Sequence, residues 1–192
     1  MASKPIERFT VEEYLAIERA AQYKNEYMDG EIVTMLGASE PHNLIVTNIA
    51  AELSVQLRGR PCRVYMSNMR VDVRESGLYA YPDVVALRGD PILPDDEQDN
   101  LRNPAAIIEV LSKSTEAYDR GKTFMKYRRI ESLLEYVLVA QDKTHVEHYT
   151  RQPNGGWLLS EATTLSDEIY LSSIASHLRL SAIYDKVSIC ES

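Results

Sequence analysis

The strongest constraint on the fold lies in residues 103–129, which read NPAAIIEVLSKSTEAYDRGKTFMKYRR. An apolar run follows the proline and is interrupted by one acid, Glu109, and such a run is typical of a buried strand. A carboxylate in a buried strand is costly unless a partner compensates its charge. Three hydroxyl residues then favour the start of a helix. The polar positions of that helix carry Asp119, Lys122, Lys126, Arg128 and Arg129. A strand that ends in an acid and leads into a basic helix can hold a metal ion and an anionic substrate together.

Composition indicates one soluble domain over residues 1–192, because 44% of the residues are hydrophobic and 26% are charged. Cys62 and Cys190 lie far apart and outside any C-x-x-C pair, so we interpret them as reduced thiols. The first residues lack the apolar core of a signal peptide, and no apolar stretch is long enough to span a membrane. These features predict a cytoplasmic protein with no membrane partner.

The net charge of −8 argues against a protein that coats DNA regardless of sequence, because such a protein needs a broad basic surface. The same charge is compatible with an enzyme that cuts nucleic acid with a metal, since its site is built from carboxylates. Local basic groups would then serve the substrate, although clusters of this kind are more often solvated surface.

Local patterns predict an α/β fold with a central mixed sheet. Thr10 and Glu13 have the spacing of a capping box for a helix that ends near Ala21, and Asp29-Gly30 indicates a hairpin. A second helix begins at Ser39 and ends near Gly59. Further predicted elements are strands at 63–67, 70–74, 84–87, 106–111 and 135–140, a hairpin around 153–156, and a final helix near Leu171–Leu178.

Two acids occupy neighbouring buried strands. Asp83 begins one strand, and Glu109 lies late in the next. If the two strands pair antiparallel, the start of one lies beside the end of the other, and the carboxylates meet at one edge of the sheet. Carboxylates that close repel each other unless a proton or a cation lies between them, and oxygen ligands suit Mg²⁺. On the residues alone, strand-end ion pairs and a metal site both remain open.

Two further residues are conditional members of this site. Glu26 lies in the first arm of the predicted N-terminal hairpin. It belongs to the site if its side chain points to the same face as the strand acids, and is a surface charge otherwise. His42 lies in the first turn of the second helix, where a histidine is more often a surface or packing residue.

Three segments together resemble the Uma-type restriction endonuclease family, a branch of the PD-(D/E)XK nuclease superfamily. They are YPDVVAL at 81–87, IIEVLSKST at 107–115 and YDRGKTFMKYRRIESLLEYVLVAQD at 118–142. The resemblance covers nearly the whole chain. It implies a restriction-endonuclease-like core, a divalent metal (Mg²⁺ or Mn²⁺) held by Asp83 and Glu109, and the carbonyl of Val110 as a backbone ligand.

The superfamily signature also places a lysine two positions after the middle acid, where this chain has Leu111. Similar sequences often carry a lysine four positions after the aspartate of the DRG segment, and Thr123 stands there in this chain. The resemblance therefore implies a displaced basic group. The candidates are Lys113, Lys122 and Lys126, of which Lys122 is our leading choice for the group near the attacking water.

The leading hypothesis is a Mg²⁺-dependent endonuclease that hydrolyses DNA and acts as a homodimer. Asp83 and Glu109 would bind the metal, Lys122 would hold the attacking water, and Glu26 and His42 would support the site. An alternative is a nuclease-fold binding or assembly module that lacks full catalytic competence. A metal hydrolase for small phosphate esters fits the net charge but has no supporting motif.

Overall fold

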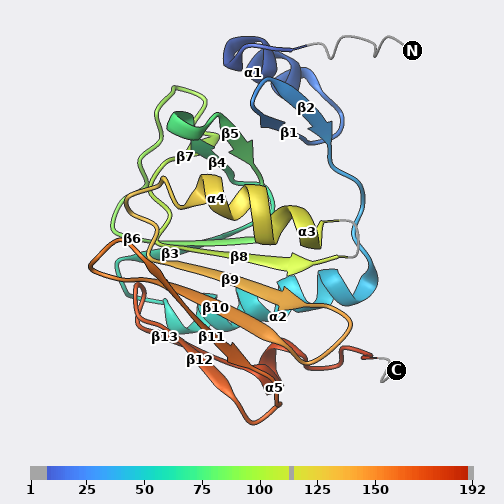
Figure 1. The fold of residues 1–192 in the computed structure, drawn as a ribbon, viewed down its shortest axis with the longest axis vertical. Coiled ribbons are helices and arrows are strands. Elements are labelled where there is room, and N and C mark those ends of the chain that lie inside the picture. The colour runs from blue at the N-terminus through green and yellow to red at the C-terminus, as the bar shows by residue number, and fades with distance from the viewer. Residues whose placement is uncertain (1–7, 113–114, 190–192) are drawn as a thin grey trace.

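A six-stranded mixed sheet forms the centre of the computed structural model, which describes residues 8–112 and 115–189 (Figure 1). Its strand order is β11-β10-β9-β8-β6-β3. The strands are β3 (Cys62–Met66), β6 (Val84–Arg88), β8 (Ala106–Leu111), β9 (Glu135–Ala140), β10 (Val146–Arg151) and β11 (Trp157–Ala162). Strands β8 and β9 are parallel, whereas the other neighbours are antiparallel. The predicted central mixed sheet is confirmed.

A second sheet, of five strands in the order β2-β1-β5-β4-β7, lies beyond one face of the first (Figure 1). Its strands are β1 (Asn25–Met28), β2 (Glu31–Thr34), β4 (Arg70–Val73), β5 (Leu78–Ala80) and β7 (Asn100–Leu101). The predicted N-terminal hairpin is β1–β2. Its turn has Asp29 at φ 52° and Gly30 at φ 93°, the left-handed pair that a tight hairpin turn needs. The predicted strands at 63–67 and 70–74 become β3 and β4, which belong to different sheets.

Within residues 8–112 and 115–189, five short or medium α-helices accompany these sheets. They are α1 (Val11–Ala20), α2 (Glu40–Gln56), α3 (Glu116–Tyr118), α4 (Phe124–Tyr127) and α5 (Leu180–Ile183), and a 3-10 turn covers Arg74–Ser76. The capping box of Thr10 and Glu13 is present at the start of α1. Ser39 caps α2 by accepting a hydrogen bond from the backbone N–H of His42. Local capping chemistry therefore sets both helix starts where the sequence predicts them.

Successive side chains along the central strands point to opposite faces of the sheet, and this divides the core into two layers. In β8, Ala106, Ile108 and Val110 pack with α2 and α5 on one face. Ile107 and Leu111 pack on the other face with α4 and the second sheet. Figure 1 shows α4 and α2 on opposite sides of the six-stranded sheet. Odd-numbered residues near the end of β8 consequently face the α4 side.

The predicted basic helix is interrupted. A π-helical turn at Asp119–Thr123 separates α3 from α4, and α4 ends at Tyr127, so that Arg128 and Arg129 follow the helix instead of lying on it. Gly121, a weak helix former, lies within the turn, and π turns insert an extra residue that changes which side chains face the core. In this chain Thr123, Phe124 and Tyr127 are buried.

The predicted helix at Leu171–Leu178 is wrong. Strands β12 (Glu168–Leu171) and β13 (Ser176–Arg179) form a hairpin there, and α5 begins only at Leu180. Leu171, Ile174 and Leu178 have a spacing that resembles a helix. The buried positions within each strand nevertheless alternate with exposed ones, which is the period of a half-buried hairpin.

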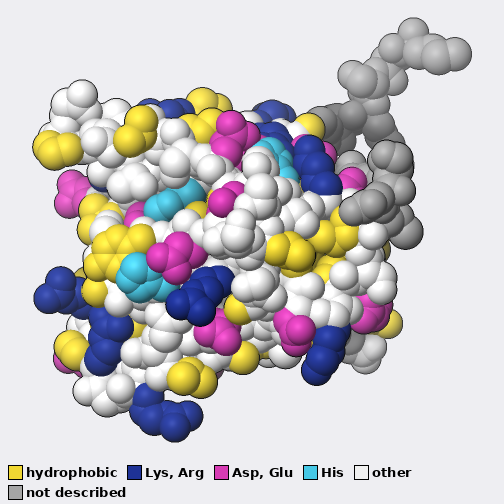
Figure 2. Space-filling view, turned by 90° about the horizontal axis from the view of Figure 1, so that it is seen from below, with side chains coloured by type: hydrophobic (Ala, Val, Ile, Leu, Met, Phe, Trp, Pro, Cys, Tyr) yellow, Lys and Arg dark blue, Asp and Glu magenta, His cyan; other side chains and the backbone are white. Residues whose placement is uncertain are grey.

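On the face seen from below in Figure 2, basic and acidic side chains are mixed with one another. The aromatic rings of Tyr149 and Trp157 pack around Phe124, with ring centroids 4.8 Å and 5.2 Å away. Cys62 is a free thiol, and Cys190 lies outside the described residues.

Within the described part of the chain, none of the helices has the length and apolar character needed to cross a membrane.

Candidate metal centre

Antiparallel pairing of β6 with β8 brings the two strand acids together. Val84 lies opposite Ile108, so Asp83, one residue earlier, lies beside Glu109, one residue later. The backbone N–H of Asp83 donates to Glu109 Oε2 at 3.1 Å, and the backbone N–H of Val110 donates to Asp83 Oδ2 at 2.8 Å. Each acid lies two residues along its strand from a side chain that packs in the layer with α4, and residues two apart in a strand face the same side. The carboxylates therefore share one face of the sheet.

Glu109 lies half-buried within this group. The hydroxyl of Tyr127 donates to its Oε1 at 3.3 Å. Burial raises the pKa of Glu109 well above its ordinary value, and the negative charges of Asp83, Asp119 and Glu26 raise it further. Without a cation, Glu109 consequently keeps a proton to a pH at which an ordinary glutamate has lost it.

His42 reaches Asp83 from the far side of the sheet. It lies in the first turn of α2, and its Nε2 is 3.1 Å from Asp83 Oδ2. Its Nδ1 is buried without a hydrogen-bond partner among the described residues. Because Nε2 holds Asp83, Nδ1 is the ring atom left to accept a hydrogen bond. The structure thus brings His42 into the site.

Glu26 also belongs to the acid group. The backbone N–H of Tyr81, two residues before Asp83, donates to Glu26 Oε1 at 3.0 Å. Burial raises the pKa of Glu26 to about 7, and the charges of Asp119 and Asp83 add to the rise. The charge of Glu26 in turn raises the pKa of Glu109, so Glu26 lies within electrostatic reach of the strand acids.

Asp119 is a member of the site that sequence reasoning placed only on a helix surface. Burial raises the pKa of Asp119 to about 6; a hydrogen bond from Thr115 opposes the rise, and the charge of Asp83 adds to it. The charge of His42 also opposes the rise in the pKa of Asp119. Asp119 begins the π-helical turn, and such turns are frequent at functional sites. The sequence showed the DRG segment but carried no sign of the turn that directs Asp119 inward.

Neither Lys122 nor Lys126 has a described contact with the strand acids. Lys122 is exposed, and no described contact joins it to Asp83 or Glu109. Lys126 donates to Asp29 Oδ1 at 2.6 Å and to the carbonyl of Ser76, which fastens α4 to the second sheet. Both lysines line a hollow of about 670 Å³ with Met28, Asp29, Glu31, Val33, Glu75, Ser76, Tyr118, Met125 and Arg129. Lys113 lies outside the described residues.

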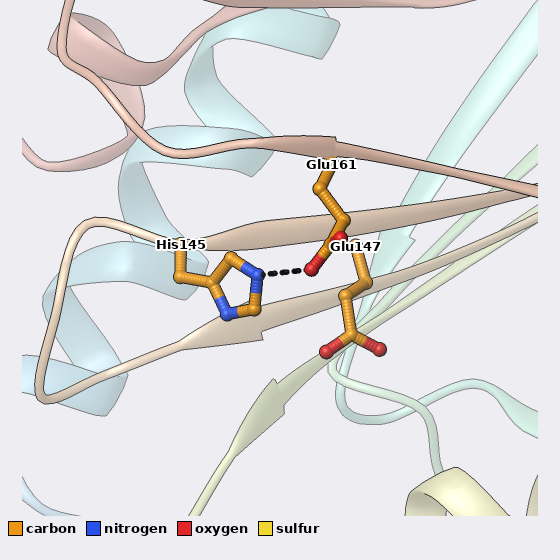
Figure 3. A group of neighbouring side chains, drawn as sticks. All are labelled: His145, Glu147 and Glu161. Carbon is orange, nitrogen blue, oxygen red and sulfur yellow. Dashed lines mark hydrogen bonds and ion pairs between the residues drawn. The ribbon is translucent and has the colours of Figure 1, made fainter.

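A second group of possible metal ligands lies on the C-terminal strands. One ligand atom from each of His145, Glu147 and Glu161 lies within 4.8 Å of the others (Figure 3). His145 Nε2 is 2.8 Å from Glu161 Oε1. Glu147, however, is ion-paired with Arg120 and accepts a hydrogen bond from Tyr149 at 2.9 Å. A cation here would have to displace Arg120, so this group is the weaker metal site.

The fold and its paired strand acids place the protein in the restriction-endonuclease-like class. The chain belongs to the Uma2 family, whose model is described as "Putative restriction endonuclease" and matches residues 11–182. In the solved structures, the chain is similar to a "putative nuclease belonging to DUF820" from Anabaena variabilis, with a TM-score of 0.75 over 94% of this chain and 99% of that chain. Their sequence identity is 17%, so this likeness shows the fold.

Two uncharacterised proteins of Synechocystis sp. are similar along most of their length. One is 37% identical over 163 residues, which cover 85% of this chain and 92% of the relative. The other is 32% identical over 182 residues, which cover 95% of this chain and 94% of the relative. The family and the fold together support a nuclease-like function.

Proposed function

We propose that this protein is a Mg²⁺- or Mn²⁺-dependent endonuclease that hydrolyses phosphodiester bonds in DNA. The observation that carries the proposal is the juxtaposition of Asp83 and Glu109 on one face of the sheet, with Glu26, His42 and Asp119 around them. Several carboxylates enclosed together repel one another unless protons or a cation compensate them. A divalent ion is the compensating charge that also serves phosphodiester hydrolysis.

The donor set fits a hard cation. Asp83 and Glu109 offer carboxylate oxygens, the ligand type that Mg²⁺ prefers. The backbone N–H of Val110 points to Asp83, and the carbonyl of the same residue points to the same edge of the strand. The Val110 carbonyl can therefore act as the third protein ligand.

A bound ion would lower the pKa of a coordinated water and stabilise the charge of the phosphate. The chain's own residues would orient the metal ligands and accept the proton of the attacking water. His42 fixes the Asp83 carboxylate through Nε2. Asp119, whose pKa is raised to about 6, can accept a proton from the attacking water near neutral pH. Glu26 stays fixed to the Tyr81 backbone and supports the carboxylate group from the first hairpin.

One observation favours the second candidate, a binding or assembly module without catalysis. The positions at which related nucleases carry lysine are Leu111 and Thr123 here, both buried, and Lys122 is exposed without a described contact to the acids. Such a module would keep the fold and would bind partners without cleaving DNA. The two proposals differ in whether metal-dependent cleavage exists.

The test compares Asp83→Ala with Glu161→Ala, a matched carboxylate removal at the C-terminal group. Calorimetry measures Mg²⁺ and Mn²⁺ binding, and a panel of supercoiled, linear and single-stranded DNA and of RNA measures cleavage. We expect Asp83→Ala to lose metal binding and to lower the cleavage rate by at least about 10³-fold, because it removes a metal ligand. Glu161→Ala should behave as the wild type does.

Cleavage by Asp83→Ala at the wild-type rate would place the site elsewhere. Loss of metal binding in Glu161→Ala instead would assign the ion to the C-terminal group. A wild-type protein that binds neither metal and cleaves no substrate, while folded by circular dichroism, would favour the binding module.

A further inference from the structure

We propose that Lys24 is the cation that serves this site, where it binds the substrate phosphate, in place of Lys122, which the sequence predicted to hold the attacking water. The inference rests on the proposed nuclease function, and it names a residue from the first hairpin instead of the helix after β8.

The hairpin directs Lys24 toward the acids. Lys24 immediately precedes β1, and its carbonyl accepts a hydrogen bond from the backbone N–H of Met35 at 2.9 Å. The backbone at Lys24 is therefore held by the other arm of the hairpin. Glu26, two residues later, lies in the acid group. Residues two apart in a strand share a face, so Lys24 points to the same side.

A single residue links the Lys24 ammonium to Asp83. Lys24 Nζ donates to the carbonyl of Ser67 at 2.6 Å, and the backbone N–H of Ser67 donates to the carbonyl of Asp83 at 3.0 Å. The ammonium also lies 5.5 Å from the centroid of the Tyr81 ring. An ammonium has three donors, and the Ser67 carbonyl uses one. The other two are available to phosphate oxygens.

The charge of Lys24 is available as well. It is half-buried, and no ion pair joins it to a carboxylate among the described residues, whereas Lys126 is paired with Asp29. Burial lowers the pKa of Lys24, and the negative charge of Asp83 opposes that fall. A partly desolvated cation attracts a phosphate more strongly than an exposed one, because the local dielectric is lower.

The described residues of the helix after β8 offer no equivalent cation. Thr123, where similar sequences often carry lysine, is only 3% exposed. That position therefore brings no charge to the acids. Lys24, which immediately precedes the first hairpin, supplies the missing charge instead.

The experiment compares Lys24→Met, Lys24→Arg and the control Lys122→Met. Single-turnover cleavage in Mg²⁺ measures the rate. Binding of a labelled DNA oligonucleotide in Ca²⁺ over a range of salt concentrations measures affinity without requiring cleavage. Thermal melting identifies any variant that fails to fold, and Lys24→Arg keeps the charge if Lys24→Met unfolds.

We expect Lys24→Met to lower the single-turnover rate by about 10²-fold, as for loss of one donor to a charged transition state. It should also reduce the slope of log affinity against log salt by about 1, because one phosphate contact is lost. Lys24→Arg should retain the wild-type salt slope. Lys122→Met should leave the rate unchanged.

The assignment would be overturned if folded Lys24→Met kept the wild-type cleavage rate and salt slope. It would also be overturned if Lys122→Met lost cleavage while Lys24→Met cleaved normally. In both cases an inactive Asp83→Ala would leave the nuclease proposal intact. If the wild-type protein does not cleave at all, the nuclease proposal fails. The salt slope in Ca²⁺ then decides whether Lys24 contacts phosphate.

Discussion

Glu26, Glu109 and Asp119 keep their protons to a higher pH than ordinary carboxyl groups do. Burial is the largest cause of the raised pKa of each group, and repulsion between the negative charges raises these pKa values further. The unfolded chain releases these protons near pH 4, whereas the folded chain holds that of Asp119 to about pH 6 and that of Glu26 to about pH 7, and the pKa of Glu109 is raised well above its ordinary value. Since the folded state binds more protons in that range, these groups stabilise the fold at low pH and lose that contribution as pH rises.

We therefore predict that the metal-free protein loses about 3–5 kcal/mol of unfolding free energy between pH 5 and pH 8 from this group. Mg²⁺ should restore stability more at pH 8 than at pH 6, because ions bind the deprotonated carboxylates. Urea denaturation with EDTA or with Mg²⁺ at each pH measures both effects. In Glu26→Gln the metal-free loss should be smaller; an unchanged loss would contradict the assignment to this group.

At the scale of elements, Glu135 fastens the β12–β13 hairpin to the central sheet. The buried carboxylate accepts the backbone N–H groups of Ser172 at 2.9 Å and Ser173 at 3.0 Å, and His148 Nε2 is 3.2 Å from it. Burial opposes ionisation of Glu135, but the hydrogen bonds from His148 and Ser173 outweigh it and hold its pKa below the ordinary value. This contribution is present above the unfolded pKa and is lost as pH falls through the lower folded one.

Glu135→Ala should destabilise the protein by about 3–5 kcal/mol, because buried donors and His148 lose their partner. Urea denaturation at pH 7 measures the change. Glu168→Ala removes a carboxylate from the same hairpin, where it is 45% exposed beside His177 and Arg179. It should cost less than about 1 kcal/mol. Equal effects of the two substitutions would show that Glu135 has no special structural role.

Sequence patterns predicted elements well where the cause is local. The turn at Asp29-Gly30 and the cap at Ser39 depend on adjacent residues, and both form as predicted. The region around Leu171–Leu178 depends on a distant partner, because Glu135 fixes Ser172 and Ser173 from β9. A helical spacing of leucines could not reveal that contact.

At the scale of the whole molecule, the net charge of −8 opposes binding to a polyanion. We predict that DNA affinity without divalent ions is weak at about 150 mM salt, in the range of non-specific binding. Ca²⁺ should strengthen it by at least about tenfold, because the ion neutralises the acid group. Fluorescence anisotropy of a labelled duplex measures this effect. Ca²⁺-enhanced affinity that survives unchanged in Asp83→Ala would place the ion outside the proposed centre.

The sequence by itself determined the mixed α/β core, the first hairpin and the two acids, because apolar periodicity, turn chemistry and an acid in a buried run are properties of short segments. It also placed Glu26 and His42 among the candidates without deciding their direction. Tertiary structure decided which side chains meet: strand register set Asp83 beside Glu109, a π-helical turn brought Asp119 inward, and the hairpin rather than the basic helix directs a lysine toward the acids. Those outcomes depend on contacts between residues far apart in the chain, and no local pattern encodes them.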